Sequence, residues 1–140
     1  MMFELLYTSV VPAGFSEQEL VDLLEKSRSK NKKHDITGML IYHNREIMQL
    51  LEGNRREVEA LFQTIFEDDR HKSVDVFYQG EIEHRSFTDW SMVFKLLDDK
   101  LISAITSGYE GHDRNISPIH MIKNSPNRGM KTFIDLRDNF

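Results

Sequence analysis

The clearest hydrophobic pattern in the chain is the apolar stretch 46–53, which carries a polar side chain, Gln49, in its middle. Side chains alternate between the two faces of a strand, so Ile47, Gln49 and Leu51 share one face. If that face packs on the core, Gln49 is a buried carboxamide, and leaving its polar atoms unpaired costs about 1–3 kcal/mol. We therefore expect Gln49 to have specific partners, either ordinary ones such as a backbone carbonyl or a water, or a ligand.

Similar patterns predict the remaining elements up to about residue 97. Ser16 with Glu19, and Asn54 with Glu57, have the spacing of helix N-caps. The apolar patterns predict strands at residues 3–9, 36–42, 46–53, 73–82 and 89–96, with one helix after the first strand and another after the third. The resulting β-α-β-β-α-β-β order is that of a ferredoxin-like α+β fold, an antiparallel sheet with two helices on one face.

The last third of the chain has weaker helical patterns, including the possible helix starts Ser117-Pro118 and Ser125-Pro126. We expect residues 1–97 to form the main domain and residues 98–140 a helical extension. The second face of an antiparallel sheet needs a cover unless it faces water. The C-terminal helices are therefore expected to cover that face, or else to form a dimer contact.

Composition narrows the class of protein. The chain has 140 residues, which suits one domain with a substantial core. A net charge of −5 argues against a nucleic-acid partner, and the absence of cysteine excludes disulfides and thiolate ligands. There is no apolar run of the roughly 20 residues that a membrane span needs, and no signal-peptide layout. We expect a cytoplasmic protein without a membrane partner.

Several polar residues are predicted to converge on the helix-covered face of the sheet. The apolar stripe of the first helix continues by helical spacing into Ser27 and Asn31, which could also simply close the helix end. The first and third strands are usually central neighbours in this fold, so Tyr7 and Gln49 could form a hydrogen bond. A flat ring would fit between the helices, facing Ile65. An amide and a phenol suit recognition of a heterocycle, whereas no hydrolytic or metal-binding pattern stands out.

Five motifs occur in order between about residues 3 and 96. They are Tyr7; Ser27 and Asn31 followed by Ile36-Thr-Gly38; Gln49-Leu-Leu-Glu-Gly53; Asp68, Arg70 and His71; and Phe87, Trp90 and Met92. Each motif is weak alone, but together they resemble the BLUF domain, a blue-light sensor that uses flavin. The length resembles that of short BLUF proteins, which implies a photoreceptor with a small helical tail and no output enzyme.

The resemblance implies a flavin-binding role for several of these residues, with FAD favoured and FMN or riboflavin possible. Asn31 would bond the pyrimidine edge of the flavin, and Ser27 and Ile65 would line its ring. Lys30 stands where some family members have a second asparagine, and it could approach a phosphate. The residues toward the ribityl–phosphate end would be Asp68, Arg70 and His71, since a guanidinium suits phosphate.

The resemblance also implies a photochemical mechanism. Tyr7 would donate an electron and a proton to the excited flavin, with Gln49 in the proton path. Gln49 would be left rotated or tautomerised, which shifts the flavin absorption to the red until the dark state returns. Trp90 and Met92 would lie on the fifth strand near Gln49, and either could be the residue beside it. The change would then reach the C-terminal helices and a downstream protein partner.

Other functions are compatible with the same fold class. An acylphosphatase needs an arginine in the loop after the first strand, and residues 10–15 contain none. An RNA-binding sheet needs basic flanks, which the acidic balance disfavours. A light-insensitive regulatory or interaction dimer remains the alternative to a photoreceptor. In either case the apolar stripes of the tail favour a homo-oligomer.

Overall fold

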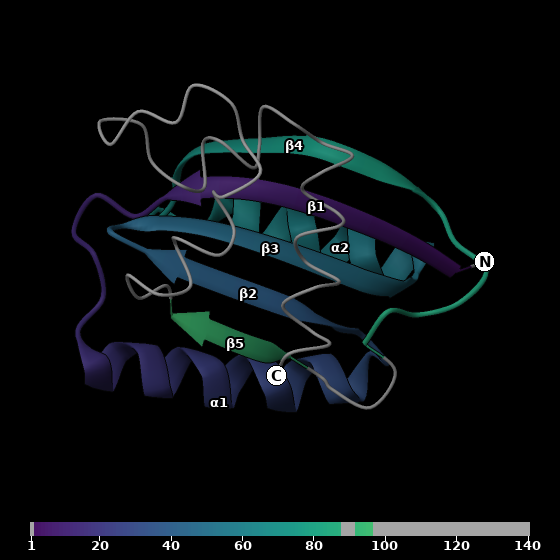
Figure 1. Cartoon of the computed structure of the whole chain (residues 1–140), viewed down its shortest axis with the longest axis horizontal. Coiled ribbons are helices and arrows are strands. Elements are labelled where there is room, and N and C mark those ends of the chain that lie inside the picture. Colours follow the sequence, from purple (N-terminus) through teal and green to yellow (C-terminus); the bar gives the residue numbers. More distant parts are fainter. Residues whose placement is uncertain (1, 88–91, 97–140) are drawn as a thin grey trace, which may run out of the picture.

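The computed structural model describes residues 2–87 and 92–96 (Figure 1). The elements are β1 (Met2–Val10), α1 (Glu17–Lys33), β2 (Thr37–His43), β3 (Glu46–Asn54), α2 (Arg55–Glu67), β4 (Lys72–Glu81) and β5 (Val93–Leu96). The predicted β-α-β-β-α-β-β order is confirmed. Trp90 and the predicted helical extension, residues 98–140, lie outside the described residues.

The five strands form one sheet in the order β4-β1-β3-β2-β5. Neighbouring strands are antiparallel except β2 and β5, which run parallel. The central position of β1 and β3 agrees with the prediction and puts Tyr7 opposite Gln49 in the ladder. The fifth strand spans Val93–Leu96, within the predicted 89–96, and its ladder with β2 begins immediately after Met92, whereas residues 89–91 lie outside the described residues.

Local sequence explains where the main elements begin and turn. The Ser16 side chain accepts a hydrogen bond from the Glu19 main chain, and the Glu19 carboxylate accepts one from Ser16 N, so α1 starts with a complete capping box. Asn54 caps α2 through a bond from Arg56 N. The strands β2 and β3 are joined through residues 44 and 45, whose positive φ angles of 47° and 70° are those of a type I′ turn.

Both helices pack on one face of the sheet, as predicted. Figure 1 shows α2 behind β1 and β3, and α1 along the β2–β5 side. The core on this face includes Leu5, Tyr7, Leu40 and Leu51 from the strands, with Leu20 and Leu24 from α1 and Leu61 and Phe62 from α2 packed against them.

The opposite face of the sheet is also buried. The strand residues Leu6, Met39, Ile41, Met48 and Leu50 have no exposed surface. The sheet is therefore apolar on both sides, which the alternation of its strands alone did not require. Within the described ranges, no helix is long and apolar enough to cross a membrane.

Candidate functional site

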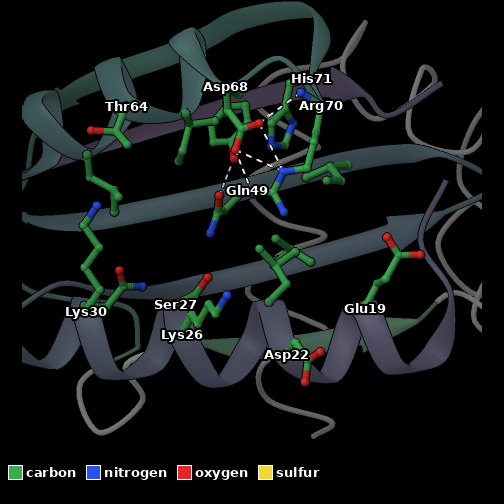
Figure 2. Close-up of a pocket in the computed structure, with 17 residues that line it drawn as sticks. Glu19, Asp22, Lys26, Ser27, Lys30, Gln49, Thr64, Asp68, Arg70 and His71 are labelled. Carbon is green, nitrogen blue, oxygen red and sulfur yellow. Dashed lines mark hydrogen bonds and ion pairs between the residues drawn. The ribbon is translucent and has the colours of Figure 1, made fainter. Parts of the chain in front are cut away.

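A cavity of about 390 Å³ lies between α1, α2 and the sheet. This size is typical of sites for small molecules and cofactors. Figure 2 shows Gln49 on the sheet, between Ser27 and Lys30 of α1 on one side and Asp68, Arg70 and His71 on the other. The structure brings to this cavity all eight residues to which the family resemblance gave a cofactor-binding or photochemical role: Tyr7, Ser27, Asn31, Gln49, Ile65, Asp68, Arg70 and His71.

The floor of the cavity contains a buried phenol–amide pair. Tyr7 and Gln49 face each other in the β1–β3 ladder, and the Tyr7 hydroxyl donates a hydrogen bond to Gln49 Oε1. Only 1% of Tyr7 and 5% of Gln49 are exposed. Burial raises the pKa of Tyr7, so the phenol is neutral at physiological pH and acts as the donor.

Met92 lies next to the same amide. Gln49 Nε2 donates to Met92 Sδ at 3.4 Å, and the methionine side chain is buried. The sequence left open whether Trp90 or Met92 lies beside Gln49. The structure places Met92 there, and Trp90 is outside the described residues.

The amide of Gln49 has bonding capacity beyond these two contacts. A carboxamide has two N–H donors and an oxygen with two lone pairs. Tyr7 uses one lone pair and Met92 one donor, and within residues 2–87 and 92–96 no further partner of Gln49 is found. The side chain borders the cavity, so the polar edge of a bound heterocycle could complete its hydrogen bonds. The residues present therefore fit a flavin.

Asn31 lies near the C-terminal end of α1, and its main chain and its side chain have different surroundings. The main-chain oxygen of Asn31 accepts from Ile36 N at 2.8 Å and from His34 N at 3.2 Å, which closes the helix end. Its side chain lines the cavity beside Ser27, and the residue is 2% exposed. Because the apolar stripe of α1 points at the core, its continuation carries Ser27 and Asn31 to the cavity wall.

The segment after α2 forms the charged border of the cavity. Arg70 Nη2 contacts Asp68 Oδ2 at 2.6 Å, and hydrogen bonding to Arg70 lowers the pKa of Asp68 to about 2. His71 Nδ1 lies 2.9 Å from the buried Ser9 hydroxyl, and burial lowers the pKa of the His71 imidazole, which is therefore neutral at pH 7. Arg70 is half-exposed, so it combines an internal ion pair with access to an anion at the cavity mouth.

Several lining residues were not predicted to contact a cofactor. Leu61 and Thr64 precede Ile65 and Asp68 on the same face of α2, and this helical spacing was a signal that could have found them. The others are Glu19, Asp22, Leu23, Lys26, Leu40 and Ile47. Among the residues that the structure describes, no group of histidine and carboxylate side chains could hold a metal ion.

An α+β domain with a buried phenol–amide pair beneath a cofactor-sized cavity belongs to the class of small ligand-binding modules. The family model described as "BLUF: Sensors of blue-light using FAD" matches residues 2–93. The chain therefore belongs to the BLUF family of flavin-binding blue-light sensors.

Relatives of known function share this part of the chain. The photoactivated adenylate cyclase subunit alpha of Euglena gracilis is 27% identical over 94 residues, which cover 67% of this chain and 9% of that protein. The blue light- and temperature-regulated antirepressor BluF of Escherichia coli is 26% identical over 74 residues, 53% of this chain and 18% of that protein. The chain thus matches only a small part of the length of these relatives.

Solved BLUF structures have a similar fold. The photo-activated state of BlsA has a TM-score of 0.80 at 25% identity, covering 97% of this chain and 94% of that one. The dark-state structure of BlrB has a TM-score of 0.68 at 28% identity, covering 89% of this chain and 96% of that one. These similarities agree with the predicted family and fold class.

Proposed function

We propose that this chain is a blue-light photoreceptor that holds FAD non-covalently between α1 and α2 and uses Tyr7 and Gln49 as its photoactive pair. The observation that carries the proposal is the buried hydrogen bond from the Tyr7 hydroxyl to an amide that also contacts Met92 and borders the cavity. FAD is chosen because the family description names it. FMN and riboflavin have the same ring.

Two groups of lining residues would contact different parts of the cofactor. Asn31 and Gln49 would bond the polar edge of the ring, because carboxamides offer both donors and acceptors. Ser27 and Ile65 would line the ring itself. Arg70 and His71 would lie toward the ribityl–phosphate end, where the guanidinium provides charge for an anion.

When bound, flavin supplies blue-light absorption and an excited state that accepts an electron. Tyr7 is the proposed electron donor. Its raised pKa keeps the ground-state phenol protonated, and loss of an electron makes the hydroxyl proton strongly acidic. Gln49 Oε1 already accepts the hydrogen bond of that proton, so it is the proposed first acceptor.

Gln49 is the proposed switch. A rotated or tautomerised amide exchanges donor and acceptor positions, and this changes its bonds to Tyr7, Met92 and the ligand together. One amide with two bonded arrangements in a buried site is a small bistable network. The change in the Gln49–Met92 contact would then be passed to β5, which begins one residue later.

The output is proposed to be a change in protein contacts. Residues 98–140 are the proposed route to a downstream protein partner, and the protein is proposed to work in the cytoplasm as a homo-oligomer without nucleic acid or membrane contacts. Size-exclusion chromatography with light scattering, in darkness and under blue light, tests the oligomeric part. A mass that stays that of a monomer in both conditions would contradict it.

The absorption spectrum of the purified protein, before and after blue light, tests the photoreceptor itself. We expect a flavin spectrum that shifts slightly to the red and returns thermally in darkness. A bound flavin without a reversible shift would refute the Tyr7–Gln49 switch while leaving flavin binding intact. A protein that remains colourless after FAD is added would refute both and favour the light-insensitive regulatory dimer.

A further inference from the structure

The exposed helix residue Arg28 joins α1 to the start of β5. Its Nε donates a hydrogen bond to the main-chain oxygen of Met92 at 3.1 Å. Arg28 follows Leu24 by about one helical turn, so it continues a row of side chains through which α1 packs on the core. The residue before it, Ser27, lines the cavity. Neighbouring rows of the same helix therefore reach the cavity and the edge of the sheet.

Met92 touches the photoactive pair directly. Its Sδ accepts a hydrogen bond from Gln49 Nε2 at 3.4 Å, and the residue is 1% exposed. The main-chain oxygen that Arg28 bonds and the sulfur that Gln49 bonds belong to this one residue. The two contacts therefore connect α1 to the amide with no intervening segment of chain.

The ladder of β5 is a weak constraint on Met92. This strand has four residues, and in the part of the sheet that the structure describes it is an edge strand that pairs with β2. Met92 precedes its first ladder pair, Met39 with Val93. Isolated short strands are only marginally stable, so the residue before such a strand needs further contacts to stay in place. The bond from Arg28 is one such contact, and a charged donor forms a stronger hydrogen bond than a neutral one.

We propose that Arg28 is a positioning residue for the Gln49 switch. Its bond holds the main chain of Met92 against α1, and this fixes where the Met92 sulfur lies relative to the Gln49 amide. The N–H···S bond of 3.4 Å is weak and depends on geometry, so a small displacement of Met92 changes the relative stability of the two amide arrangements. The inference rests on the proposed photoreceptor function and assigns a role to a residue outside the set that lines the cavity.

Two substitutions separate the hydrogen bond of Arg28 from its charge. Arg28→Leu keeps a good helix former at an exposed position and removes the donor. Arg28→Gln removes the charge but places an amide nitrogen the same number of bonds from Cα as the arginine Nε, so it can still donate to the Met92 oxygen. We expect Arg28→Leu to change the rate of dark recovery by about fivefold, equivalent to about 1 kcal/mol in the barrier, and Arg28→Gln to stay within about twofold of wild type.

A double-mutant cycle with Met92→Leu tests whether the effect passes through the sulfur. In the Met92→Leu background, Arg28→Leu should change the recovery rate by less than about twofold, because the contact that Arg28 positions is absent. An unchanged rate in Arg28→Leu would overturn the inference. So would an equal change with and without the sulfur, which indicates a purely structural role, or an equal change in Arg28→Gln, which indicates an effect of charge.

A second readout needs no light. The side-chain amide resonances of Gln49, assigned by comparison with Gln49→Leu, are recorded in darkness with FAD added. We expect them to shift in Arg28→Leu and to stay in place in Arg28→Gln and in Lys32→Leu, which changes an exposed residue about one turn further along α1. Unchanged resonances in Arg28→Leu would overturn the inference. A wild-type protein without a reversible red shift would refute the proposed function, while these resonances would still report whether Arg28 positions Met92 against the amide.

Discussion

The Tyr7–Gln49 pair gives the most informative single substitution, Tyr7→Phe. Phenylalanine keeps the ring and its edge-on contact with Phe62, whose centroid lies 5.4 Å away, so the packing is preserved. The variant removes the hydrogen bond that the Tyr7 hydroxyl donates to Gln49 Oε1, at a residue that is 5% exposed. A buried acceptor that loses its donor costs about 1–3 kcal/mol, and this is the expected loss of stability.

Urea denaturation at one saturating FAD concentration measures that loss, because bound ligand adds to stability and must be held constant. The double variant Tyr7→Phe/Gln49→Leu removes the unpaired acceptor as well. We expect its destabilisation to fall short of the sum of the single variants by about 1–2 kcal/mol. In both Tyr7→Phe and Gln49→Leu, flavin should stay bound and the light-induced red shift should disappear.

Tyr42→Phe is the matched control. The Tyr42 hydroxyl is also buried and accepts a hydrogen bond from Phe15 N at 3.1 Å, outside the set of residues that line the cavity. This variant should lose about 1 kcal/mol of stability and keep a normal red shift. A normal photocycle in Tyr7→Phe would refute the assigned role of Tyr7, and a lost shift in Tyr42→Phe would show that the spectral change reports on general stability instead.

Two further predictions concern stability. A Cβ on Gly38 would lie 1.9 Å from the Leu50 carbonyl oxygen, so Gly38→Ala should cost about 3 kcal/mol in urea denaturation, whereas Gly80→Ala, with nothing within 4 Å of its Cβ, should be nearly neutral. The bond to Arg70 holds the pKa of Asp68 near 2, below its usual 3.8. The contribution of this ion pair to the free energy of unfolding is therefore present above about pH 4 and is lost as the pH falls toward 2. Because this pair is partly exposed, its contribution to stability should be below about 1 kcal/mol. Asp68→Asn should remove this contribution from the pH dependence of stability. A pH profile of stability that is unchanged in the variant would contradict the prediction.

Local signals in the sequence predicted much of the fold. The Ser16–Glu19 spacing predicts a helix start because the capping hydrogen bonds join residues only three positions apart. These bonds therefore do not depend on contacts with distant parts of the chain. Alternation along residues 46–53 correctly indicated that Gln49 shares the core-facing side with Ile47 and Leu51. The family resemblance then named eight residues that the structure gathers around one cavity.

The contacts between distant segments were decided only by the tertiary structure. The sequence placed Met92 in the predicted fifth strand and left open whether Met92 or Trp90 lies beside Gln49, because β5 pairs with β2 and not with a sequence neighbour. The same is true of Glu52, whose motif was recognised while its partners, Ser86 and Phe87, lie 34 and 35 residues away.

The sequence by itself determined the order of the elements, the two helix starts and the side of the sheet to which Gln49 belongs. These depend on interactions within a few residues and on the fixed periods of helices and strands. The tertiary structure decided which side chains complete the hydrogen bonds of a buried amide and a buried carboxylate, because burial requires a partner but does not specify one.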